Sequence, residues 1–170
     1  MKLFGRRDTP PADALGHLPR DERVVSWADL VDGAVVLASP SGLWWPADDA
    51  HRLIAWPHII KAVWRDGRLT VFEADVVDDL LLVDRDPVVA ELSVPRDLPP
   101  VVRKRIEANV VHSQVHPVPG GSARFVARRI PGQDGLRWWA RLDDGTRDGA
   151  DVRSAVAARR DLLAAEHAVG

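Results

Sequence analysis

Short apolar runs rich in β-branched residues follow one another between residues 23 and 94, and turn signals separate them. The clearest pair flanks Asp66-Gly67, a dipeptide that suits a two-residue type I′ turn because both central positions need a positive φ. Asp32-Gly33 is a second signal of the same kind. The pattern predicts an antiparallel sheet whose strands cover residues 23–31, 34–39, 43–45, 52–56, 59–65, 68–74 and 88–94.

A helical period replaces the strand pattern after residue 96. Val102, Ile106 and Val110 are spaced by four and therefore lie on one face of a helix. Asp97 is a candidate N-cap, and the two prolines that follow suit the first turn. We expect a helix that ends near His112, because prolines and glycines follow a few residues later.

The other segments have weaker signals. Residues 75–86 predict an acidic loop with room for one short strand, and residues 123–130 and 136–142 predict a hairpin with a longer loop. An alanine-rich helix is expected from residue 151 to about residue 167. This divides the chain into a flexible tail (1–20), a sheet with its helix (21–116), and a hairpin-helix extension packed on the same domain (117–170).

The composition supports a folded domain and excludes several chemistries. Of the 170 residues, 46% are hydrophobic, and no apolar run approaches the ~18 to 20 residues of a membrane span. The first residues lack the apolar stretch of a secretory signal, so we expect a cytoplasmic protein. The absence of cysteine excludes disulfides, thiolate nucleophiles and cysteine metal sites. Most tryptophans are expected in the core, namely Trp27, Trp45, Trp56, Trp64 and Trp138, whereas Trp44 should face the other way.

The order of elements resembles bacterial pleckstrin-homology-like domains. Three local features carry the resemblance: Leu43-Trp44-Trp45 after a glycine turn, the step Trp56-Pro57-His58-Ile59-Ile60, and the Asp66-Gly67 hairpin. The resemblance covers roughly Glu22 to Ser113. It implies an α+β fold in which a helix caps an antiparallel sheet or partial barrel, and a fold class that binds lipids, peptides or proteins. The chain also resembles actinobacterial proteins of unknown function, and its twenty arginines against three lysines are typical of a GC-rich genome.

Charge is distributed in two blocks of opposite sign. Residues 66–95 contain eight acidic and two basic side chains, and residues 96–141 contain nine basic and three acidic ones. Such blocks either pair within the fold or give the surface a dipolar field that orients a partner.

A basic and aromatic surface is the best candidate site. Alternation puts Arg137, Trp139 and Arg141 on one face of the last predicted strand, and Arg124 and Arg128 alternate on its partner. An indole among guanidinium groups suits a protein interface, bases or anionic head groups. The alternative is that Trp139 packs beneath the C-terminal helix while the arginines pair with the acidic block. The candidate binding residues are Arg124, Arg128, Arg129, Arg137, Trp139 and Arg141.

No motif predicts catalysis, a metal or a cofactor. His112 and His116 have the i, i+4 spacing of a helical metal site, but Pro117 favours an extended backbone before it. Ser41-Gly42 lacks the flanking glycines of a nucleophile elbow, and Gly120-Gly121-Ser122 lacks the lysine and spacing of a phosphate loop.

The sequence therefore favours a non-catalytic cytoplasmic binding or adaptor module, whose contacts are mainly to an unidentified protein. Two alternatives remain open. One is binding of anionic lipid or nucleic acid by the patch of residues 124–141, which predicts strong salt dependence. The other is an enzyme whose site no motif reveals.

Overall fold

The elements of the fold are known from a computed structural model, which describes residues 9–168. Its helices are α1 (Ala12–Gly16), α2 (Leu98–Asn109) and α3 (Ala150–His167), with one 3-10 turn, η1 (Trp56–His58). Its strands are β1 (Ser26–Leu30), β2 (Val35–Ala38), β3 (Gly42–Ala47), β4 (Ala50–Ala55), β5 (Ile59–Arg65), β6 (Arg68–Val77), β7 (Leu81–Asp84), β8 (Val88–Val94), β9 (Val110–Val118), β10 (Gly121–Arg128) and β11 (Arg137–Leu142).

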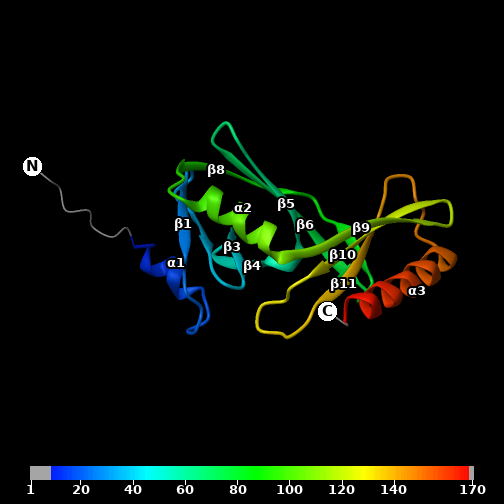
Figure 1. Cartoon of the computed structure of the whole chain (residues 1–170). Coiled ribbons are helices and arrows are strands. Elements are labelled where there is room, and N and C mark those ends of the chain that lie inside the picture. The colour runs from blue at the N-terminus through cyan, green and yellow to red at the C-terminus, as the bar shows by residue number, and fades with distance from the viewer. Residues whose placement is uncertain (1–8, 169–170) are drawn as a thin grey trace, which may run out of the picture.

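The strands form one continuous, unclosed sheet, in the order β4-β3-β2-β1-β8-β6-β7-β11-β10-β9, with β5 paired to β6. Every pairing is antiparallel except the short parallel contact of β7 with β11. Strand β6 joins two halves, because its first residues pair with β8 and its last residues pair with β7. We call β1–β6, β8 and α2 the first lobe, and β7, β9–β11 and α3 the second lobe (Figure 1).

Each lobe has its own core beneath its own helix. In the first lobe, Leu98 and Val102 of α2 pack on the inner face of the sheet, together with Ile54, Ile59 and Val71. In the second lobe, α3 packs against Phe125 and Trp138. The buried residues of α3 in this core are Val152, Val156 and Leu163. The α+β class and the antiparallel sheet are therefore confirmed, together with the C-terminal helix.

The Asp66-Gly67 turn has the predicted geometry, since φ is 51° at Asp66 and 76° at Gly67. At Asp32-Gly33 only the glycine has a positive φ, 88°, so this turn is not of type I′. The acidic segment contains the short strand for which the sequence left room, β7, and β6 extends three residues beyond its predicted end.

The prediction for the end of α2 was wrong. The helix ends at Asn109, and the next nine residues form strand β9. The β-branched side chains of Val110, Val111 and Val115 favour a strand. Pro117 is tolerated there because β9 is an edge strand that pairs only with β10. His112 and His116 therefore do not have the helical spacing that a metal pair would need.

The predicted tail also contains structure. Residues 1–8 lie outside the described part of the chain, but α1 forms within residues 9–20, and Ala14 is buried. It packs against Trp27, Leu37 and Trp44 on the outer face of the first lobe. Trp44 does face opposite to Trp45, as alternation predicts, yet α1 covers it.

Candidate functional site

The strand register gathers the predicted basic and aromatic residues. Strands β10 and β11 pair Arg124 with Arg141 and Arg128 with Arg137, and Trp139 lies between these two arginine pairs. Side chains at alternate positions share a face, so five of the six candidates project from the same side of the second lobe. Arg129 follows β10 and is exposed.

Trp139 is not a surface residue. Only 4% of it is exposed, and it packs against Ala74, Leu82 and Val126. The ring of His58 meets the indole edge-on at 5.8 Å. The packing that the sequence predicted beneath the C-terminal helix belongs to the neighbouring Trp138. Trp139 instead fills the junction of the two lobes.

Arg128 is buried in the same junction, with 3% of its surface exposed. One guanidinium nitrogen donates to the carbonyl of Ile59 at 3.1 Å and to Oδ1 of Asn109 at 3.3 Å. Within residues 9–168 its Nε has no hydrogen-bond partner and no carboxylate forms an ion pair with it. Burial lowers the pKa of Arg128 to about 10, so it stays protonated at neutral pH.

The two charge blocks pair within the fold. Arg137 lies 3.4 Å from a carboxylate oxygen of Asp79, and Arg141 donates from Nε to Asp84 at 2.8 Å. The hydrogen bond from Arg141 lowers the pKa of Asp84. Within residues 9–168, these contacts leave Arg124 and Arg129 as the exposed candidates whose guanidinium groups have no carboxylate partner. A lipid or nucleic acid would therefore compete with internal ion pairs for this face.

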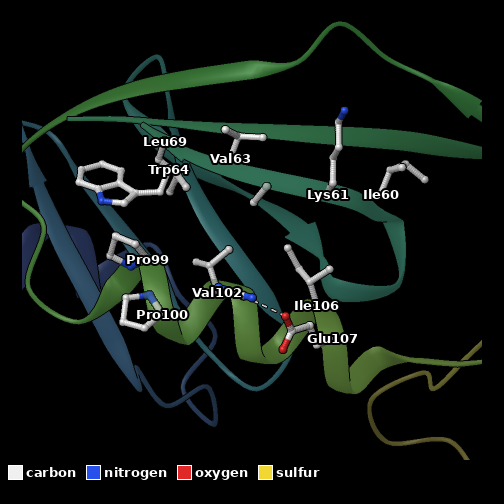
Figure 2. Close-up of a pocket in the computed structure, with 12 residues that line it drawn as sticks. Ile60, Lys61, Val63, Trp64, Leu69, Pro99, Pro100, Val102, Ile106 and Glu107 are labelled. Atoms are coloured by element: carbon white, nitrogen blue, oxygen red, sulfur yellow. Dashed lines mark hydrogen bonds and ion pairs between the residues drawn. The ribbon is translucent and has the colours of Figure 1, made fainter. Parts of the chain in front are cut away.

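An apolar concave site lies elsewhere, between α2 and β5 (Figure 2). Its volume is about 630 Å³, and its lining is mainly apolar. Trp64 and Pro99 stand at one end, and Ile60 and Ile106 at the other. Five consecutive residues of β5, 60–64, line it. Because their side chains alternate between the faces of the sheet, the groove must run along the edge of the strand.

The edge of β5 that borders this groove is unpaired. Arg65 and Arg68 flank the two-residue turn and form the first hydrogen-bonded pair of the ladder between β5 and β6. Non-hydrogen-bonded and hydrogen-bonded pairs then alternate along the two strands, and Trp64 and Ala62 belong to non-hydrogen-bonded pairs. The backbone N–H and C=O groups of Ala62 and Trp64 therefore point away from β6. Between residues 9 and 168, no other element donates to or accepts from them.

Trp64 gives the groove a large apolar side chain that is accessible from outside. It is 41% exposed, although Leu69, directly opposite on β6, is fully buried. The sequence predicted Trp64 as a core residue, because tryptophan is usually buried. It is exposed because it lies at the hairpin end, where α2 covers it only in part. No sequence signal indicated that β5 would remain an edge strand.

His58 connects the groove strand to the lobe junction. Burial is the main cause that lowers its pKa, Arg128 acts in the same direction, and Glu73 and Asp75 oppose both. In the unfolded chain a histidine titrates near pH 6.5. As the pH falls through that value, the unfolded state takes up a proton that folded His58 does not accept. The free energy of unfolding therefore decreases until the pH reaches the lower folded pKa.

We accordingly predict that His58→Gln flattens the acid limb of the stability profile. Urea unfolding at a series of pH values from about 8 to about 5 measures the free energy of unfolding of both proteins. The other histidines contribute equally to the two profiles, so the difference between the profiles reports the contribution of His58. The wild type should lose more stability than His58→Gln over this range. Parallel profiles would contradict the assignment.

Residues 9–168 contain no group of three or more histidine or acidic side chains placed to hold a metal ion. None of their helices combines the length and apolar character needed to cross a bilayer. His112 contacts Trp138 and His167, and His116 contacts Phe125, so both histidines take part in packing between β9 and its neighbours.

Comparison of the chain with protein-family models, with curated proteins and with solved structures finds no match.

Proposed function

We propose that the protein is a non-catalytic, cytoplasmic protein-binding module that holds an extended segment of its partner in the groove between α2 and β5. The observation that carries the proposal is the position of an apolar groove along an unpaired strand edge. This keeps the protein-binding function that the sequence favours and moves its surface from the second lobe to the first. The proposal also retains a pleckstrin-homology-like first lobe, supported by a strand series that precedes the covering helix α2.

The unpaired edge defines what kind of partner fits. The outward groups of Ala62 and Trp64 offer two donors and two acceptors, which an extended backbone satisfies by adding a strand. An edge of this kind also pairs non-specifically unless something covers it. Binding of a partner strand therefore both satisfies the backbone and protects the edge.

The groove lining defines which side chains of that segment contact the protein. A strand advances about 3.3 Å per residue and presents every second side chain to the same face. The groove is bordered by apolar surface from both sides, with Ile106 and Val102 on the helix and Trp64 on the strand. We expect a segment of roughly four or five residues with apolar side chains at alternate positions, anchored beside Trp64.

Ala62→Pro tests the strand-addition mode directly. Its N–H points into the groove and takes no part in the β5–β6 ladder, so proline removes one outward donor and leaves the hairpin bonded. Peptides selected from a random display library on the wild type should bind Ala62→Pro about fivefold more weakly, because one backbone hydrogen bond contributes about 1 kcal/mol. Fluorescence anisotropy of a selected, labelled peptide measures the change.

A matched control and a second variant accompany this test. Val115→Ser changes a 47% exposed, β-branched strand residue of β9 that lies outside the groove, and it should bind like the wild type. Trp64→Ala should weaken binding by removing the apolar anchor. The proposal fails if selection yields no peptides with alternating apolar residues. It also fails if folded Ala62→Pro and Trp64→Ala both bind as the wild type does.

A further inference from the structure

A second pocket lies on the opposite flank of α2, at the junction of the lobes. It has a volume of about 450 Å³ and is bounded by the C-terminal end of α2, by the loop between β10 and β11, and by Pro40 and Trp56. This volume is within the usual range of small-molecule sites, roughly 300–1,000 Å³. The pocket is separate from the groove along β5.

Two arginines without carboxylate partners line this pocket, Arg105 and Arg129. Other arginines form ion pairs: Arg52 and Arg85 with Glu73, and Arg137 with Asp79. Within residues 9–168, no ion pair involves Arg105 or Arg129. Two of the residues that line this pocket therefore carry a guanidinium charge that no ion pair of the described chain neutralises.

A third positive charge lies behind the pocket wall. Asn109 lines the pocket and accepts a hydrogen bond from the buried Arg128, and its own Nδ2 donates to the carbonyl of Arg129 at 2.6 Å. The charge of Arg128 lies in a low-dielectric interior, where it is less screened than a surface charge. Among residues 9–168, Asp134 is the one acidic residue that lines the pocket. The balance of charge around the pocket is therefore positive.

We propose that this junction pocket binds a small oxyanion group, a phosphate or a carboxylate, between Arg105 and Arg129. Guanidinium groups bind such groups with paired, charge-assisted hydrogen bonds. The apolar surfaces of Pro131 and Ala108 beside them leave room for an organic body attached to the anion. The ligand is thus a small organic anion, and its site does not depend on the proposed peptide groove.

Titration followed by NMR tests this site with the full chain. Sodium phosphate and sodium acetate are added in separate series, with sodium chloride keeping the ionic strength constant. We expect saturating amide shifts at Asn109 and at residues 129, 130 and 132–135 in at least one series. Saturation with phosphate alone identifies a phosphoryl ligand, saturation with acetate alone a carboxylate, and saturation with both a general oxyanion site.

Three variants make the assignment specific. Arg105→Gln combined with Arg129→Gln should weaken binding at least tenfold, because charge-assisted hydrogen bonds are lost. Asp134→Asn should strengthen it, since the pocket loses its acidic side chain. Arg124→Gln removes an exposed arginine outside the pocket and should leave the titration unchanged. Shifts that do not saturate, or that persist equally in the double variant, would overturn the proposal.

Discussion

Trp139→Ala is expected to lower the free energy of unfolding by about 3–5 kcal/mol, the cost of truncating a large buried aromatic side chain. The indole contacts residues from both lobes, including Ala74 and Leu82, and its Nε1 donates to Asp79 at 3.2 Å. Its removal leaves a cavity at the junction and an acceptor without its donor. Urea unfolding followed by circular dichroism measures the loss.

Trp64→Ala is the matched control for this change. The same atoms are removed, but Trp64 is 41% exposed whereas Trp139 is 4% exposed. Its loss of stability should therefore be clearly smaller. Together the two variants separate the two tryptophans: one should reduce stability and the other should reduce peptide binding. Equal stability losses would show that Trp139 does not have the packing described here.

Gly42→Ala is expected to destabilise the first lobe by about 3 kcal/mol, at the upper end of the usual overpacking range. A Cβ at this position would lie 2.2 Å from the carbonyl oxygen of Ile54 and 2.8 Å from Cα of Ala55. Both are backbone atoms of β4, which the ladder with β3 holds in place. The two strands would have to separate to accommodate a methyl group.

The corner that contains Gly42 has little freedom to relax. The N–H of Ser39 donates to the carbonyl of Gly42 at 2.9 Å, and the N–H of Trp56 donates to the carbonyl of Ser41 at 3.2 Å. Gly16→Ala is the matched control, because its added Cβ meets nothing within 4 Å. Thermal unfolding should show a large loss for Gly42→Ala and almost none for Gly16→Ala. Similar melting temperatures for both variants would refute the close-approach argument.

The predicted surface of residues 124–141 shows what side-chain periodicity can predict and what it cannot. Alternation correctly placed Arg137, Trp139 and Arg141 on one face, since side-chain direction depends only on local backbone geometry. It did not reveal that His58, Ile60 and the end of β6 pack against Trp139 on that face. The covering segments are 60 to 80 residues distant in the sequence, so no local pattern contains the information.

To predict the groove between α2 and β5, one must know which strands pair in the sheet as well as the hydrophobic pattern of the sequence. The sequence identified β5, its turn and the apolar face of α2 separately. Whether β5 is an edge strand depends on which strands pair with β6 on its other side, and β8 and β7 take that position. Strand β9 was missed for a related reason: its partner β10 stabilises an extended conformation that the preceding helical period obscured.

The sequence by itself determined the local features of this protein: the hairpin at Asp66-Gly67, the alternation of the strands, the amphipathic C-terminal helix and the opposed charge blocks. These follow from backbone sterics and side-chain periodicity over a few residues. The tertiary structure alone decided that Trp139 and Arg128 are buried, that Trp64 is exposed beside an unpaired edge, and that Arg105 and Arg129 share a pocket. Burial and pairing arise from contacts between distant segments, and the free energy of those contacts depends on the whole fold.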